Sequence, residues 1–190
     1  MNSIPRRIFL ALFPLVPLVL ASRAAAQPAP TVVIVVRHAE KAAAPANDPP
    51  LTAAGAARAK ALAAVLADAN VQAIISTPLV RTLETARPTA EAHALAVQTV
   101  PVGGPVADHA RAVAAAVRKH PGTTVLVVGH SNTVAAIIAA LGGPKMPDLC
   151  DSQYSNLFTL VLDGASARLV RASYGAPSPD PDASCLNAMK

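Results

Sequence analysis

The 190-residue chain suits one domain, and 53% of its residues are hydrophobic, so it can bury a sizeable core. Charged residues make up 14% of the chain, and the formal net charge is +5. Aromatic residues make up only 3%, and no basic cluster interleaved with aromatics is present. The composition therefore argues against a nucleic-acid-binding protein.

The first 26 residues have the layout of a secretory signal peptide. Arg6 and Arg7 form a basic segment, an apolar run of 13 residues follows at 8–20, and three alanines at 24–26 supply a cleavage site. The alternative is a membrane anchor, but a spanning helix needs about 20 apolar residues. We therefore expect cleavage after Ala26 and a periplasmic or secreted product without a membrane span. The paired arginines also resemble the twin-arginine motif, and the export route stays open.

Cleavage at that point changes the charge and the reading of the cysteines. Three arginines and no acidic residue lie within residues 1–26, so the net charge falls from +5 to +2 and residues 27–190 form the expected domain. Cys150 and Cys185 are the two cysteines, and in an oxidising compartment such a pair favours a disulfide. No cysteine or histidine spacing is typical of zinc, so we expect no metal.

Short apolar runs alternate with helical segments along the rest of the chain. The β-branched run at 31–36 predicts a strand buried on both faces of a sheet. After a proline-rich loop at 42–50, Thr52 can cap the next helix. The core-facing stripe of that helix is expected to comprise Leu62, Val65, Leu66 and Ala69.

A second strand is expected at 71–76, followed by a helix that starts at Thr77-Pro78 and is broken or restarted at Pro88. The remaining expected elements are a strand at 96–101, a helix at 108–120, a strand at 124–128, a helix at 132–141, and a hairpin of strands at 156–162 and 167–172.

This alternation predicts an α/β fold, a three-layer sandwich with a mostly parallel sheet and helices on both faces. In such sheets, ligands bind beyond the carboxyl ends of the strands. Arg37 and His38 follow the first strand and His130 follows the fourth, so we expect these side chains in one crevice. Arg81 sits in the first turn of a helix, where a cation opposes the helix dipole, and this unfavourable position suggests a functional reason.

These residue types suit a phosphorylated substrate. The guanidinium of an arginine binds two phosphate oxygens at once and stays protonated. A neutral imidazole nitrogen can attack phosphorus when the other ring nitrogen donates to a fixed acceptor. The charge of the transferring phosphoryl group must then be stabilised by fixed donors.

Four sequence blocks coincide with the expected strand ends and helix starts. They are Val36–Lys41 (VRHAEK), Leu51–Gly55 (LTAAG), Ser76–Ala86 (STPLVRTLETA) and Val127–Asn132 (VVGHSN). In this order, over about residues 31–141, they resemble the signatures of the histidine phosphatase superfamily, the phosphoglycerate-mutase-like group.

The resemblance implies a phosphatase that forms a phosphohistidine intermediate on His38, without a metal or cofactor. It implies that Arg37 and Arg81 bind the phosphoryl group and that His130 completes the pocket as a donor. The substrate would be a small phosphomonoester or phosphoramidate. Residues 27–190 would then be one histidine phosphatase domain of a small exported bacterial branch.

The proton donor to the leaving group has no clear equivalent in the sequence. Asp108 is the candidate acid, and a helix N-cap is the alternative role for the same side chain. His93, His109 and His120 are interpreted as solvated surface residues.

Two alternative functions stay open at this stage. A binding protein of the cell envelope could keep the phosphate pocket without turnover. The missing acid keeps that alternative open, whereas the intact set of Arg37, His38, Arg81 and His130 favours an enzyme. A phosphoglycerate-type mutase would need to retain and return the phosphate, and such enzymes usually have a longer chain.

Overall fold

A single mixed sheet organises the described part of the chain. The computed structural model describes residues 29–164, 166–180 and 185. Within them, six strands form one sheet in the order β3-β2-β4-β1-β5-β6. The elements are β1 (Thr31–Arg37), α1 (Ala53–Val65), β2 (Val71–Ser76), α2 (Val80–Ala92), β3 (Val97–Thr99), α3 (Val106–Val117), β4 (Thr124–Gly129), α4 (Val134–Ala140), β5 (Asn156–Asp163) and β6 (Ser166–Ser173).

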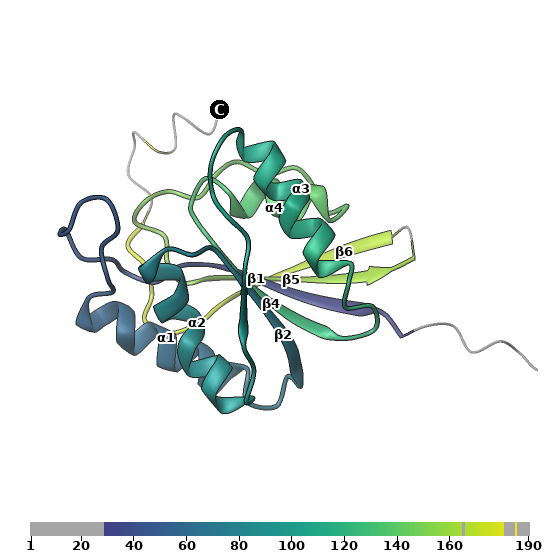
Figure 1. Ribbon diagram of the computed structural model, residues 1–190, viewed down its shortest axis with the longest axis horizontal. Coiled ribbons are helices and arrows are strands. Elements are labelled where there is room, and N and C mark those ends of the chain that lie inside the picture. The colour runs from purple at the N-terminus through teal and green to yellow at the C-terminus, as the bar shows by residue number, and fades with distance from the viewer. Residues whose placement is uncertain (1–28, 165, 181–184, 186–190) are drawn as a thin grey trace, which may run out of the picture.

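The four strands β3, β2, β4 and β1 are parallel, whereas β5 and β6 form an antiparallel hairpin on the edge beside β1. Helices α1 and α2 cover one face of the sheet and α3 and α4 cover the other (Figure 1). The predicted three-layer α/β sandwich with a mostly parallel sheet is therefore confirmed.

Alternation along the central strands divides the core into two halves. Val33 and Val35 of β1 pack with residues of α3 and α4, whereas Ile34 and Val36 pack with residues of α1 and α2. Successive side chains of a strand point to opposite faces, so a strand covered on both sides needs an unbroken apolar run. This is why β1 and β4 are the most apolar strands and why they lie at the centre.

Three of the four predicted core positions of helix α1 and the turn after it are confirmed, since Leu62 and Leu66 are buried and Ala69 is partly buried against the same core. Thr52 is the N-cap, as predicted, and its hydroxyl oxygen accepts a hydrogen bond from the Gly55 N–H. The buried positions of the helix are Gly55, Arg58, Ala59 and Leu62. Val65 is 57% exposed, so its predicted core position is wrong. Gly55 and Arg58 are buried although neither has an apolar side chain, so the apolar pattern of the sequence did not predict these two positions.

Helix α2 also differs from the prediction at both proline positions. It begins at Val80, two residues after Pro78, and continues through Pro88 to Ala92. Thr85 and Ala86 before Pro88, and Thr89 and Ala90 after it, are buried. This packing on both sides of Pro88 offsets the hydrogen bond that proline cannot make.

The expected signal peptide at residues 1–26 lies outside the described residues, and its cleavage stays a prediction. Among the described residues, no helix combines the length and apolarity required to cross a membrane.

Candidate active site

The pairing of β1 with β4 brings the two predicted site histidines together. Arg37 at the end of β1 is the register partner of Gly129 at the end of β4. The His38 N–H then donates to the Gly129 carbonyl over 2.9 Å. His130 follows Gly129, and the ring centroids of His38 and His130 lie 5.3 Å apart.

The ring of His38 is oriented by its neighbour in the chain. Its Nδ1 lies 2.8 Å from the Ala39 carbonyl oxygen, which can only accept, so Nδ1 carries the hydrogen and Nε2 carries the lone pair. The side chain is 3% exposed. Burial, together with the nearby Arg37, lowers the pKa of His38 to about 3. At neutral pH the ring is therefore uncharged and Nε2 can act as a nucleophile.

His130 is likewise buried and uncharged at neutral pH. Burial, followed by the charge of Arg81, lowers its pKa to about 4. Its Nε2 lies 3.2 Å from the Thr77 hydroxyl oxygen, which in turn lies 2.7 Å from the Thr82 hydroxyl. The backbone N–H of His130 donates to the Thr133 hydroxyl over 2.9 Å. The threonines that follow β2 and β4 thus position this ring.

Arg37 is held by the segment that precedes β5. Its Nη1 donates to the carbonyl oxygens of Cys150 and Asp151 at 2.9 and 3.0 Å, and its Nη2 lies 3.3 Å from the Asp151 carboxylate. The guanidinium also stacks over the Tyr154 ring, 4.1 Å from its centroid. These contacts fix a cation that is only 2% exposed. Sequence reasoning missed Asp151 and Tyr154, because neither lies in a recognised block.

Arg81 approaches from the first turn of α2. Its Nη1 lies 3.6 Å from the carboxylate of Asp48, which also accepts a hydrogen bond from the Val80 N–H. The loop after β1 therefore fixes the start of α2. Arg81 and His130 line the same cavity, of about 220 Å³.

The two predicted phosphate-binding arginines share one feature. The Nε atoms of Arg37 and Arg81 are both buried and have no hydrogen-bond partner among the described residues. A buried N–H of a cation without an acceptor is costly, and such groups are normally satisfied by a protein group, water or a ligand. An anion with several oxygens would satisfy both, so the site fits a phosphoryl group.

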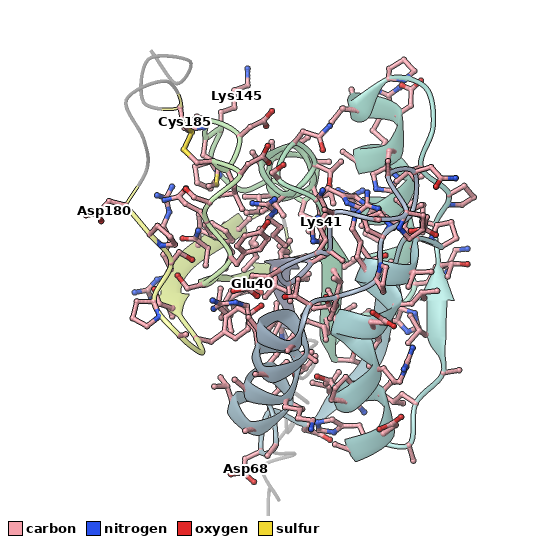
Figure 2. All side chains as sticks on the ribbon, turned by 90° about the vertical axis from the view of Figure 1, so that its left-hand side faces the viewer. Glu40, Lys41, Asp68, Lys145, Asp180 and Cys185 are labelled. Atoms are coloured by element: carbon pink, nitrogen blue, oxygen red, sulfur yellow. A yellow bond between two sulfur atoms is a disulfide. The ribbon has the colours of Figure 1, made fainter. Side chains whose placement is uncertain are left out.

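Glu40 is held by an ion pair with Arg58 of helix α1. Its carboxylate receives hydrogen bonds from Nε and Nη2 of the buried Arg58 at 2.7–3.0 Å. Although burial alone would raise the pKa of Glu40, these bonds and the nearby Arg37 hold that pKa below its usual value. In Figure 2, Glu40 lies beyond the N-terminal end of α1, and Asp68 lies beyond the C-terminal end of the same helix. Glu40 therefore fixes the segment after His38.

Asp108 does not join this group. Helix α3 begins at Val106 with Pro105 as the N-cap, so Asp108 lies in the first turn and the alternative N-cap role is wrong. Its carboxylate pairs with Arg111 of the same helix, and its side chain is 56% exposed. It does not line the cavity of His130 and Arg81.

Its neighbour His109 does line that cavity and is buried, so its interpretation as a surface residue is wrong. The spacing of the buried residues of α3, which include Val113 and Ala116, places His109 on the apolar face of the helix. This spacing is the sequence feature that could have predicted its burial.

A disulfide lies behind the segment that holds Arg37. Cys150 and Cys185 are bonded, with Cα atoms 5.7 Å apart, and Figure 2 shows the bond at the labelled Cys185. The Ser178 hydroxyl accepts the backbone N–H groups of Tyr154 and Ser155, each at 2.8 Å. Segment 150–155 is therefore tied to the C-terminal part of the chain at both of its ends.

No group of three or more His, Cys, Asp or Glu side chains within the described part of the chain is placed to hold a metal ion.

A family model confirms the resemblance read from the sequence blocks. The model of the histidine phosphatase superfamily, branch 1, matches residues 33–102. Over these residues the chain is similar to the histidine phosphatase superfamily. The uncharacterized protein Rv0525 of Mycobacterium tuberculosis is 53% identical over 51 residues, which are 27% of this chain and 25% of that protein. The chain thus spans about a quarter of the length of the curated relatives that it matches.

Solved structures share the fold. The protein histidine phosphatase SixA complexed with tungstate is 21% identical, with a TM-score of 0.61 over 75% of this chain and 96% of that one. The mycobacterial glucosyl-3-phosphoglycerate phosphatase Rv2419c is 19% identical, with a TM-score of 0.57 over 77% and 99%. A putative phosphohistidine phosphatase SixA from Agrobacterium tumefaciens is 25% identical, with a TM-score of 0.54 over 78% and 99%.

Proposed function

We propose that this protein is a phosphatase that hydrolyses small phosphomonoesters or phosphoramidates through a phosphohistidine on His38. The observation that carries the proposal is the state of the His38 ring. Its Nδ1 is occupied by the Ala39 carbonyl, its Nε2 is unprotonated, and its pKa is about 3. A binding protein that only recognised phosphate would have no use for an unprotonated imidazole among cations.

The first step transfers the phosphoryl group to the protein. The His38 Nε2 lone pair attacks phosphorus, an N–P bond forms, and the bond to the leaving group breaks with its electron pair. Arg37, Arg81 and His130 surround the phosphoryl oxygens and stabilise their charge through the transition state. The buried position of Arg37 strengthens this attraction, because little water screens it.

The second step returns the protein to its initial state. A water oxygen attacks the same phosphorus, the N–P bond breaks, and inorganic phosphate leaves. The fixed Nδ1–H of His38 keeps the ring in one tautomer, so Nε2 regains its lone pair. The same residues around the phosphoryl group serve both steps.

The named activities of structural neighbours support the substrate class. One neighbour is a protein histidine phosphatase, whose substrate bond is a phosphoramidate, and another is a glucosyl-3-phosphoglycerate phosphatase, whose substrate bond is a phosphoester.

A substrate screen tests the proposal. The parent and His38→Ala proteins would be assayed for phosphate release from aryl phosphates, sugar phosphates and phosphohistidine. We expect turnover by the parent and none by the variant, with both folded by circular dichroism. Equal activity in the two proteins would contradict the proposal, because His38 would then have no part in the reaction.

We also propose that the protein acts outside the cytosol, after removal of residues 1–26. The Cys150–Cys185 disulfide supports this location, because such bonds persist in oxidising compartments. Expression of the full chain in a bacterial host, followed by fractionation and N-terminal sequencing, should find residue 27 at the amino terminus in the envelope fraction. An uncleaved cytosolic product would contradict it.

A further inference from the structure

We propose that His109 is the proton donor to the leaving group in the reaction proposed above, on which this inference rests. Such a donor would be a catalytic residue, since it contacts the substrate oxygen whose bond breaks. Neither the sequence blocks nor the named relatives assign a role to this residue.

His109 is buried beside the phosphoryl site. It lies in the second turn of α3 and is 5% exposed. The cavity of about 220 Å³ that it lines is also lined by Arg81 and His130, and by Gly103 and Gly104 of the segment that leads into α3. His109 is near enough to His130 to contribute to the lowered pKa of that ring. A substrate held by Arg81 and His130 would therefore lie in the cavity that His109 lines.

The ring of His109 leaves one nitrogen available. Its Nδ1 lies 2.9 Å from the Pro101 carbonyl oxygen, so Nδ1 donates there and its hydrogen is committed. Its Nε2 is buried and has no hydrogen-bond partner within the part of the chain that the structure describes. Native structures rarely leave a buried polar atom unpaired without a ligand or functional reason. The fixed Nδ1–H means that Nε2 is the atom that gains and loses a proton.

Among residues 29–164, 166–180 and 185, those that line the cavity include no aspartate or glutamate. Asp108 is adjacent to His109 in the helix, but consecutive helical residues point about 100° apart, and its carboxylate is paired with Arg111. Imidazole is the other side chain that commonly transfers protons at neutral pH. His109 therefore holds the position in which the sequence offered no clear acid.

The proton balance can be written for both steps. The proposed first step starts with a proton on His109 Nε2, taken up from solvent. As the His38 Nε2–P bond forms and the P–O bond breaks, the proton of His109 Nε2 moves to the leaving oxygen. In the second step, His109 Nε2 removes a proton from the water that attacks phosphorus, and the N–P bond breaks. The Nδ1–H bond to Pro101 persists throughout.

The test compares leaving groups that differ in their need for a proton. The variant His109→Asn keeps a short N–H donor for the Pro101 carbonyl and removes Nε2. An alkyl phosphate needs protonation of its leaving oxygen, whereas p-nitrophenyl phosphate does not. We expect kcat/KM of the variant to fall by about 10²-fold or more for propyl phosphate and by less than about tenfold for p-nitrophenyl phosphate.

Two matched variants serve as controls. Asp108→Asn alters the neighbouring exposed residue, and His93→Asn alters a histidine whose Nε2 contacts the Leu66 carbonyl outside the cavity. Both should keep the parental ratio of the two activities. His109→Gln repeats the test with a longer side chain. Inhibition by inorganic phosphate shows whether the phosphoryl pocket of each variant is intact.

An equal loss on both substrates, or no loss on either, would overturn the role of His109. The parent provides a test that does not depend on a folded variant, because an intact donor predicts a shallow dependence of kcat/KM on leaving-group basicity. A steep dependence in the parent would also overturn the inference while leaving phosphatase activity established. If the parent hydrolyses neither substrate nor a phosphoramidate, the proposed function fails, and the inference fails with it.

Discussion

The uncharged state of His38 and His130 depends on burial beside two arginines. Because their folded pKa values are about 3 and about 4, neither ring takes up a proton near neutral pH, whereas both do so near pH 6.5 in the unfolded chain. The resulting contribution to stability is complete above pH 6.5 and is lost as the pH falls from 6.5 toward about 4 for His130 and about 3 for His38.

This state gives a prediction at the residue scale. NMR titration of the folded protein should show no protonation of either ring between pH 5 and 8. The free energy of unfolding should fall below pH 6.5 by up to about 1.4 kcal/mol per pH unit for each histidine. His38→Ala should reduce that slope. A His38 resonance that titrates near pH 6.5 would contradict the neutral nucleophile.

Arg81 gives a second prediction at this scale. Arg81→Ala should lose about 2.7–4 kcal/mol of transition-state stabilisation, as expected for removal of one preorganised donor. Arg81→Lys should restore little, because lysine lacks the unpartnered Nε–H and the planar fork. Arg87→Lys is the control, since Arg87 on the same helix is 60% exposed and pairs with Glu84. Full activity in Arg81→Lys would exclude the bidentate role.

At the scale of the elements, the junction between β1 and α1 holds the residues after His38. The Glu40 carbonyl accepts hydrogen bonds from the N–H and hydroxyl of Thr52, and the backbone of Gly55 packs directly on it. A Cβ at Gly55 would lie 2.3 Å from that carbonyl oxygen. The Leu-Thr-x-x-Gly block thus combines an N-cap with a close backbone contact.

Gly55→Ala is therefore expected to reverse the usual sign of this substitution. In an ordinary helix, alanine in place of glycine stabilises by about 0.5–1 kcal/mol. Here we expect a lower melting temperature and lower activity, because the clash moves Glu40 and the loop after His38. Ala57→Gly, at an exposed position of α1, should cost only about 1 kcal/mol and keep activity. Unchanged or raised stability in Gly55→Ala would contradict this account.

At the scale of the whole molecule, the disulfide links the C-terminal segment to the backbone that holds Arg37. Cys185→Ser should lower the free energy of unfolding by about 3–4 kcal/mol, since the bond joins two cysteines that are 35 positions apart in the sequence. It should also lower kcat/KM, because the Cys150 carbonyl accepts from Arg37. Denaturant unfolding and kinetics measure the two effects. Two free thiols in the exported protein would contradict the pairing.

The order of strands and helices and the pairing of His38 with His130 could be predicted, because both depend on the pattern of apolar residues along the chain. Continuous apolar runs identified β1 and β4, and parallel strand ends brought His38 and His130 together. His109 could not be found in this way, since its burial depends on how α3 packs beside the loop at 100–105. The partner of Glu40 was equally hidden, because Arg58 lies 18 residues away and meets it only after folding.

Direct detection of the phosphorylated residue tests the central claim. The parent would be mixed with a substrate that it turns over, quenched under basic conditions within a single turnover, digested and examined by mass spectrometry. We predict an acid-labile, base-stable phosphate on His38, with none in His38→Ala. Turnover by the parent with an unmodified His38, or with phosphate on another residue, would contradict the account.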